Sequence, residues 1–122
     1  MSFFFLTPTA AHEDAHPDDV AAALTNDASL TLLDVRSEAE HRTVRLTNSH
    51  NIPLEALTQD AMVSVGLGED AKHKEIYVYC RSGGRSRMAC QQLQAMGYTN
   101  VKNISGGMLQ WEASGHGCIT RD

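Results

Sequence analysis

The sequence lacks the marks of several common protein classes, and each absence narrows what the chain can be. Its three cysteines form no CxxC pair and are odd in number, which is unlike the disulfide framework of a small secreted domain. It has no surplus of positive charge, since its formal net charge is −5, so we expect no nucleic-acid partner. Unpaired cysteines favour a reducing compartment, and we expect a cytoplasmic location.

The N-terminal segment lacks the basic residues that open a secretory signal. No Lys or Arg precedes the apolar run from Phe3 to Leu6, and Pro8 and Glu13 soon follow it. We therefore expect neither a signal peptide nor a membrane span. The run is instead predicted to form an edge strand.

The length and hydrophobic content of the chain are those of one packed domain. Its 122 residues with 42% hydrophobic content suffice for one core, so residues 1–122 are predicted to form a single domain. Strands are predicted over residues 30–35, 49–52, 75–79 and 101–104, and helices over 17–26, 38–42, 54–65, 87–96 and 108–114. Ser37 and Glu40 have the spacing of a capping box, which opens the second helix. The alternation of strands and helices predicts an α/β fold around a mostly parallel sheet.

The segment from Cys80 to Ser86 stands between a predicted strand and a predicted helix. Ligands of α/β sheets bind at the carboxyl ends of the strands, which is where Cys80 lies. Gly83 and Gly84 can adopt positive φ and bring backbone amides close to a bound atom, and the next helix points its positive end there. Such surroundings commonly lower the pKa of a thiol. The segment therefore predicts a nucleophilic thiolate at Cys80.

Two simpler interpretations of this segment remain. Cys80 can be a small buried core residue, and Arg81, Arg85 and Arg87 can be a solvated basic patch. A core cysteine, however, needs neither two glycines nor flanking arginines. An acidic chain has also placed three of its ten Lys and Arg residues in this short stretch. We therefore favour an anionic ligand beside a reactive Cys80.

Three motifs carry a family resemblance. They are Leu32 to Arg36 with Glu40 following, Asn51 to Leu54, and Cys80 to Ser86 with Gly106 to Trp111 beyond it. In these motifs, their order and their spacing, the sequence resembles the rhodanese-like sulfurtransferases over nearly its whole length. The resemblance implies a central, mostly parallel five-stranded sheet flanked by helices on both faces.

The resemblance also implies roles for individual residues. Cys80 would be the catalytic residue and would become persulfidated, with no metal and no cofactor. The substrate-binding loop would consist of Arg81, Ser82, Gly83, Gly84, Arg85 and Ser86. Its amides would hold the persulfide sulfur, and Arg85 would close the loop and face the anion.

Three residues outside the loop are expected to support it. Asp34 and Arg36 match the first motif, and we expect them to brace the sheet end by hydrogen bonds rather than touch substrate. Trp111 matches the aromatic residue of the last motif and is expected to pack the terminal helix beneath the loop.

The loop also bears on the reaction and its partners. Sulfurtransferases of this family have four residues between the cysteine and the loop-closing position, as here between Cys80 and Arg85, whereas related phosphatases have five. Relatives with Arg after the cysteine often use thiosulfate, so Arg81 favours thiosulfate as the small-molecule donor. The sulfur would pass to a thiol or cyanide, a protein acceptor being one option, in a double displacement with ping-pong kinetics.

One segment departs from the family pattern, and the remaining cysteines and two histidines have simpler interpretations. The chain has Val44 to Ser49 where the family usually has Gly-His-Ile-Pro-Gly-Ala, so the turn there is expected to be rebuilt. Cys90 is interpreted as a core-facing residue, and a redox role for Cys118 has no supporting signal. His12 and His16 have the spacing of one helical turn, but two ligands do not make a metal site.

Two functions of other classes stay open at this point. Folds do not fix function, and rhodanese-like domains also occur as non-catalytic binding or regulatory modules. A small phosphatase or arsenate reductase is the third reading, which the loop length disfavours. A sulfurtransferase is the function that the retained cysteine and the complete loop favour.

Overall fold

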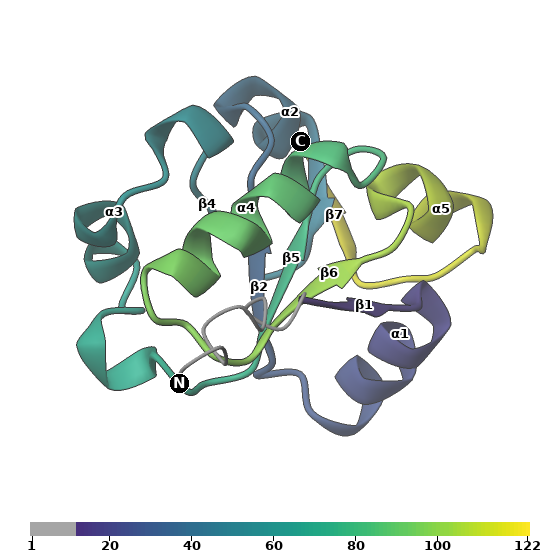
Figure 1. Ribbon diagram of the computed structural model, residues 1–122. Coiled ribbons are helices and arrows are strands. Elements are labelled where there is room, and N and C mark those ends of the chain that lie inside the picture. Colours follow the sequence, from purple (N-terminus) through teal and green to yellow (C-terminus); the bar gives the residue numbers. More distant parts are fainter. Residues whose placement is uncertain (1–11) are drawn as a thin grey trace.

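The computed structural model describes residues 12–122, and its centre is a five-stranded sheet (Figure 1). Neighbouring strands pair in parallel in the order β1, β6, β5, β2, β4. The strands are β1 (Glu13–Ala15), β2 (Thr31–Asp34), β4 (His50–Asn51), β5 (Ile76–Tyr79) and β6 (Val101–Ile104). The predicted α/β fold around a parallel sheet is confirmed. The edge strand predicted from Phe3 to Leu6 lies outside the described residues, and β1 forms that edge of the sheet.

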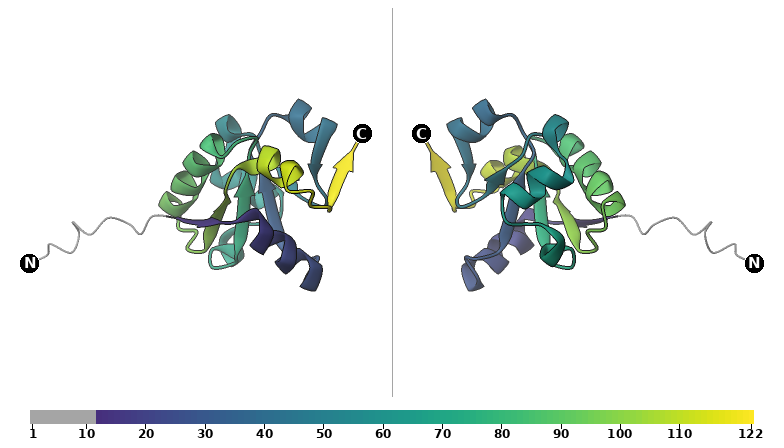
Figure 2. Two further views of the ribbon diagram at one scale, coloured as in Figure 1. Left: turned by 90° about the vertical axis from the view of Figure 1, so that its right-hand side faces the viewer. Right: turned by 90° about the vertical axis from the view of Figure 1, so that its left-hand side faces the viewer.

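Helices cover both faces of the sheet, as predicted (Figures 1 and 2). They are α1 (Pro17–Asn26), α2 (Glu38–Thr43), α3 (Gln59–Ser64), α4 (Gly84–Ala95) and α5 (Gly107–Ala113). α1 and α5 pack on one face and α3 and α4 on the other. α2 follows β2 at the carboxyl edge of the sheet and has no buried residue. Among residues 12–122, every helix falls short of the length and apolar composition needed to cross a membrane.

Each face of the sheet has its own apolar core. Leu33 and Val78 point into the core shared with α3 and α4, and Leu32 and Tyr79 point into the core shared with α1 and α5. Every residue of β2 and β5 is buried. Central parallel strands are covered on both faces, which is why these two strands are continuous runs of mostly apolar residues in the sequence.

The predicted capping box at the start of α2 is present. The Ser37 hydroxyl accepts a hydrogen bond from the Glu40 amide at 3.1 Å, and a Glu40 carboxylate oxygen accepts one from the Ser37 amide at 3.1 Å. Two amides that the helix cannot satisfy internally thus find side-chain partners. The cap also fixes the Glu40 side chain at the carboxyl edge of the sheet, close to where Cys80 lies.

Two helix predictions need correction. Residues 54–65 do not form one helix, because a short 3-10 turn (Leu54–Ala56) ends at Leu57 and α3 begins again after Thr58. The Thr58 hydroxyl accepts from the Ala61 amide and caps this new start. The second correction concerns α4, which begins at Gly84 rather than at residue 87. The last residues of the predicted loop therefore form the first turn of a helix.

A small second sheet was not predicted. β3 (Val44–Leu46) pairs antiparallel with β7 (Ile119–Arg121), and the Thr47 amide donates to the Cys118 carbonyl at 2.7 Å. β3 occupies the start of the segment where the sequence departs from the family pattern. Asn48 has a φ of 65°, in the left-handed region, and lies between β3 and β4. That this turn is rebuilt relative to the family stays a prediction.

Candidate active site

Cys80 lies directly after β5, at the carboxyl edge of the central sheet. Its side chain is buried, with 1% of the residue exposed. The Sγ atom accepts a hydrogen bond from the Gly83 amide at 3.0 Å and lies 3.3 Å from the Ser86 hydroxyl. The loop thus folds back over the sulfur, as a nucleophile held by backbone amides requires.

These hydrogen bonds make the Cys80 thiol more acidic than an ordinary cysteine. Burial raises the pKa of Cys80, because a thiolate loses solvation inside the protein. The Ser86 hydroxyl and the amides of the loop outweigh burial, and the pKa is lowered from its ordinary value. The sequence predicted this direction from the helix N-terminus and the neighbouring arginines. Hydrogen bonds are the largest causes that lower the pKa of Cys80, and the charge of Arg85 also interacts with the thiolate.

Backbone conformation explains why the loop needs glycine. Gly83 is the N-cap of α4 and has a φ of 112°, which side chains rarely tolerate. Gly107 has a φ of 58°, and a Cβ atom there would lie 2.3 Å from the Cys80 carbonyl oxygen. Both positions therefore favour glycine. Gly83 does so because of its backbone conformation, and Gly107 does so because of its conformation and because a Cβ atom would collide with the loop.

The N-terminus of α5 holds the loop from the other side. The Met108 amide donates to the Cys80 carbonyl at 2.9 Å, and the Leu109 amide donates to the Arg81 carbonyl at 3.0 Å. The close approach of Gly107 makes both bonds geometrically possible. The sequence singled out Gly106 and Gly107 as part of a motif but did not reveal this clamp, which we call the α5 clamp below.

Ser86 connects the sulfur to a second polar layer. Its hydroxyl donates to the Asn103 side-chain oxygen at 2.5 Å. The Asn103 amide nitrogen in turn donates to an Asp14 carboxylate oxygen at 3.1 Å. Ser86 and Asn103 are both buried. Asn103 was missed at the sequence level, and no local pattern marks it.

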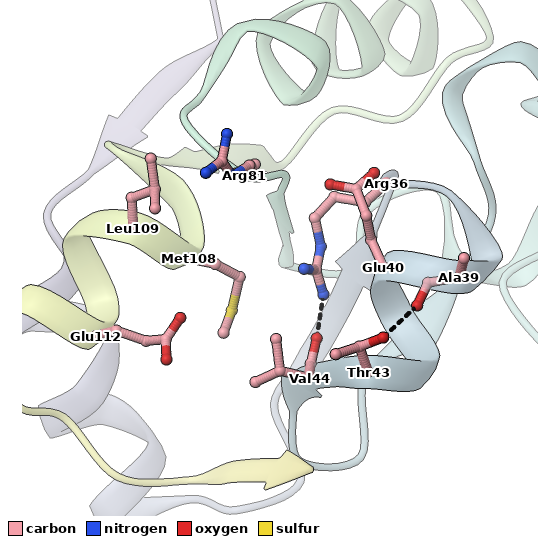
Figure 3. A pocket seen from close by; sticks show the side chains of 9 residues that line it. All are labelled: Arg36, Ala39, Glu40, Thr43, Val44, Arg81, Met108, Leu109 and Glu112. Atoms are coloured by element: carbon pink, nitrogen blue, oxygen red, sulfur yellow. Dashed lines mark hydrogen bonds between the residues drawn. The ribbon is translucent and has the colours of Figure 1, made fainter. Parts of the chain in front are cut away.

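The three arginines around the loop have different surroundings. Arg85 is held by Glu40 in a two-pronged ion pair, with nitrogen to oxygen distances of 2.7 and 3.0 Å. Arg85 holds the pKa of the Glu40 carboxyl down at about 2. The role of Arg85 in facing an anion stays a prediction, since its guanidinium is engaged by this pair. Arg81 and Arg87 are exposed, and Arg81 borders a cavity between α2 and α5 (Figure 3).

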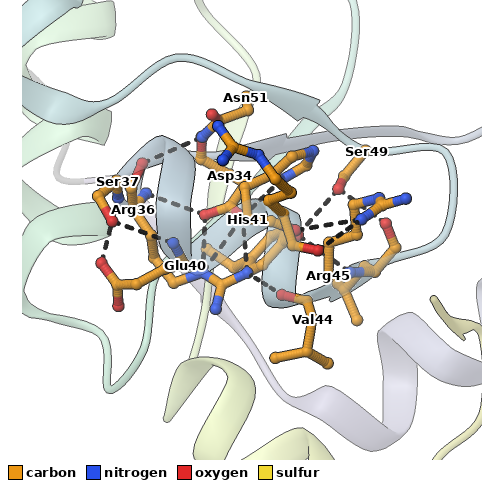
Figure 4. A network of polar contacts seen from close by, with 12 residues as sticks. Asp34, Arg36, Ser37, Glu40, His41, Val44, Arg45, Ser49 and Asn51 are labelled. Atoms are coloured by element: carbon orange, nitrogen blue, oxygen red, sulfur yellow. Dashed lines mark hydrogen bonds and ion pairs between the residues drawn. The ribbon is translucent and has the colours of Figure 1, made fainter. Parts of the chain in front are cut away.

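Asp34 and Arg36 form a buried network at the end of β2 (Figure 4). Arg36 donates from Nε and Nη2 to the Asp34 carboxylate, at 3.0 and 2.8 Å, and from Nη2 to the Val44 carbonyl at 2.5 Å. His41 lies 2.8 Å from the same carboxylate. The Asn51 side chain donates to the carbonyls of Asp34 and Arg36. These contacts join β2, α2, β3 and β4. That the pair braces the site without touching substrate stays a prediction.

Trp111 is buried in the core between the sheet and α1. Its Nε1 atom donates to the Gly117 carbonyl at 2.9 Å, and it belongs to the same buried cluster as Val20 and Leu24 of α1. Met108 and Leu109, earlier on α5, are the residues of this helix whose amides donate to Cys80 and to the loop. Trp111 therefore holds α5 in the core, and its support of the loop stays a prediction.

The remaining candidates lie away from the loop chemistry. Cys90 is fully buried, and burial raises its pKa to about 12. Cys118 is exposed and free. His16 caps α1 by accepting from the Asp18 amide at 3.1 Å. Within residues 12–122, no three His, Cys, Asp or Glu side chains gather in a way that would hold a metal ion.

Comparison with known proteins confirms the family resemblance. The family model of the Rhodanese-like domain matches residues 16–114. The "Adenylyltransferase and sulfurtransferase uba4" of Ogataea parapolymorpha is 40% identical over 80 residues, which make up 66% of this chain and 19% of the relative. The "Sulfurtransferase" of Allochromatium vinosum is 28% identical over 98 residues, or 80% of this chain and 86% of the relative.

A solved structure extends the similarity to three dimensions. The crystal structure of thiosulfate sulfurtransferase from Pseudomonas aeruginosa matches with a TM-score of 0.73 at 27% identity. The match covers 90% of this chain and 20% of that chain. This chain therefore spans about a fifth of the length of both the uba4 relative and this structure, but most of the length of the Allochromatium relative.

Proposed function

Because this chain belongs to the rhodanese-like domain family, we propose that it is a sulfurtransferase that carries sulfane sulfur as a persulfide on Cys80. The observation that carries the proposal is the hydrogen bonding of the Cys80 Sγ atom by the Gly83 amide and the Ser86 hydroxyl. These donors stabilise a thiolate, and a thiolate is the form that attacks a sulfur donor. Residues 1–122 act as one domain in this proposal.

The first half-reaction loads the sulfur. The Cys80 thiolate attacks the outer sulfur of thiosulfate, a bond forms between the two sulfurs, and the bond to the inner sulfur breaks with release of sulfite. The name of the Pseudomonas structure and the position of Arg81 beside the cysteine support thiosulfate as the donor. Arg81 would attract the anion, while amides of the loop would hold the transferred sulfur.

The second half-reaction unloads the sulfur. A thiol, from a small molecule or a protein, or cyanide attacks the outer sulfur, and the Cys80 thiolate is regenerated. The loop keeps the geometry that stabilised the thiolate before loading, so the same donors favour its departure. A free, reduced Cys80 is required at the start of each cycle, which fits a reducing compartment such as the cytoplasm.

Intact mass of the purified protein tests the proposal directly. After incubation with thiosulfate we expect the protein to gain the mass of one sulfur atom, and after cyanide we expect this mass to be lost with formation of thiocyanate. The Cys80→Ser variant should gain nothing. Cys118→Ser is the matched control, because it removes an exposed thiol from outside the loop and should load normally.

Two results would reject the proposal. One is sulfur loading that persists in Cys80→Ser, which would move the reaction to another residue. The other is a Cys80 that stays unloaded with thiosulfate and with an organic mercapto-acid donor. That outcome, together with tight binding of a partner protein, would favour the non-catalytic binding module.

A further inference from the structure

A cavity of about 360 Å³ lies beside the Cys80 loop, between α2 and β3 on one side and α5 on the other (Figure 3). Its volume falls within the range of small-molecule sites in proteins. Ala39, Val44, Met108 and Leu109 give it a mostly apolar wall. Leu109 is 47% exposed and places apolar surface at the opening.

The cavity is joined to the reactive loop by contacts on two sides. Met108 lines the cavity, and its amide holds the Cys80 carbonyl at 2.9 Å. Glu40 lines the opposite side and holds Arg85 of the loop through the ion pair. Arg81, which follows Cys80 in the chain, completes the lining next to the loop. A molecule in this space therefore lies next to the loop that holds the sulfur.

The charges around the cavity leave one cation available. Arg36 pairs with Asp34 at 2.8 Å, and the two lining carboxylates, Glu40 and Glu112, pair with arginines outside the lining. Among the described residues, Arg81 is the charged lining residue with no opposite charge within ion-pair distance. The cavity thus offers one free positive charge beside an apolar wall.

An apolar wall does not stabilise bound thiosulfate or cyanide, since neither has a hydrocarbon part to bury. We propose that the cavity is the acceptor site of the sulfurtransferase and that it selects a small organic thiol with a carboxylate and an apolar segment. The carboxylate pairs with Arg81, and the apolar segment packs against Val44, Met108 and Leu109. This inference rests on the proposed function, because it presupposes a persulfide on Cys80.

The transfer step balances without a further reactant. The acceptor thiolate attacks the outer sulfur of the protonated Cys80 persulfide, and the bond between this sulfur and Sγ breaks. The electron pair of that bond leaves on Sγ, which returns to the thiolate. The outer sulfur departs with its proton as the persulfide of the acceptor.

The test starts from protein already loaded with sulfur, so that only the second half-reaction is measured. Loss of the persulfide is followed with N-acetylcysteine and with N-acetylcysteamine, which lacks the carboxylate, at equal thiolate concentrations and low ionic strength. We expect N-acetylcysteine to react roughly two- to fivefold faster, as one exposed ion pair allows. Arg81→Gln should remove this difference, whereas Arg87→Gln, on an exposed residue outside the cavity, should keep it.

A second variant tests the apolar wall. Ala39→Phe places a large ring at the exposed edge of the cavity and should slow both organic thiols much more than cyanide. Ala22→Phe, on an exposed position of α1, is the matched control. Equal rates for the two thiols in the wild type, or equal slowing of thiols and cyanide by Ala39→Phe, would overturn the inference. Failure of Cys80 to load at all would instead reject the proposed function.

Discussion

The Ser86 hydroxyl has one proton, and three acceptors surround it. These are the Asn103 side-chain oxygen at 2.5 Å, the Gly83 carbonyl at 3.2 Å and the Cys80 Sγ atom at 3.3 Å. Asp14 fixes the orientation of Asn103, so the oxygen of Asn103 must face Ser86. While Cys80 is a thiol, its S–H can donate to Ser86 and the hydroxyl proton stays with Asn103. When Cys80 ionises, the hydroxyl must turn to the sulfur in order to stabilise it.

The first prediction concerns this hydroxyl. Ser86→Ala should raise the pKa of Cys80, because it removes the side-chain donor that helps to outweigh burial. Iodoacetamide alkylation of Cys80, measured against pH in a Cys118→Ser background, should shift its midpoint upward. At pH 7 the rate should fall roughly ten- to a hundredfold, as expected for the loss of one hydrogen bond to a charged group.

Ser82→Ala is the control for this measurement. The Ser82 side chain is exposed, and its contribution to Cys80 comes from the backbone amide, which alanine keeps. An unchanged midpoint in Ser86→Ala would show that the amides alone set the acidity of the thiol. A midpoint that shifts equally in both variants would point to a general disturbance of the loop.

At the residue scale, the sequence predicted the members of the loop but not their partners. Cys80, Gly83 and the arginines were found because an unusual composition stands at a strand-to-helix junction. Asn103 was missed because a single Asn in a strand has no local signature. Its contact with Ser86 depends on the register of β5 and β6, which places Val78 beside Asn103.

Among the elements, α5 holds the loop from outside, through the α5 clamp. Two amides at the start of this helix are unsatisfied within the helix itself, and both donate to carbonyls of the loop. The clamp requires the backbone of α5 to approach the loop closely, and Gly107 permits this approach. Activity should therefore depend on a residue that contributes no side chain.

The second prediction tests the clamp by adding a single carbon atom. Gly107→Ala would place Cβ 2.3 Å from the Cys80 carbonyl oxygen and 2.6 Å from the Arg81 carbonyl oxygen. The loop must move, so we expect sulfur transfer to fall at least tenfold. The free energy of unfolding should fall by about 2–4 kcal/mol, which combines left-handed strain with overpacking. Steady-state kinetics and urea denaturation measure the two effects.

Gly115→Ala separates strain from steric conflict. Gly115 has a φ of 74°, but a Cβ atom there would have no neighbour within 4 Å. This variant should lose about 1–2 kcal/mol of stability and keep its activity. If Gly107→Ala and Gly115→Ala behaved alike, the close approach of α5 to the loop would have no functional importance.

Element prediction succeeded where local signals and packing agree. The helix 17–26 and the strand 101–104 have the predicted bounds, and the capping box placed the start of α2. The prediction over 54–65 failed because apolar residues at helical spacing continue across the Thr58 cap. β3 and β7 were missed because each has three residues and their pairing joins segments more than 70 residues apart, which no local pattern reveals.

In the whole molecule, two cores share one sheet. Alternate residues of β2 and β5 enter opposite cores. If the packing of one core is lost, one face of these strands becomes exposed, and the strands that support the other core are destabilised as well. A domain built in this way is expected to unfold in one cooperative transition. The sequence contains a natural reporter for each core. Trp111 is the single tryptophan and lies in one core, and Cys90 lies in the other.

The third prediction uses these two reporters. In a Cys80→Ser, Cys118→Ser background, Cys90 is the remaining thiol, and its alkylation reports exposure of the core beneath α4. Trp111 fluorescence reports the core beneath α1 and α5. We expect the two signals to change at the same urea concentration. Separate midpoints would show that the two faces of the sheet unfold independently.

The way the loop is held has a consequence for how this protein can change under selection. The sulfur and the loop carbonyls are held largely by backbone amides, whereas the wall of the neighbouring cavity is made of side chains. Substitutions at Ala39 or Leu109 can therefore alter what enters the cavity while the nucleophile keeps its surroundings. A library confined to such wall positions should yield variants with new acceptor preferences at a high frequency. The reason is that backbone amides hold the nucleophile, whereas side chains at other positions contact the acceptor.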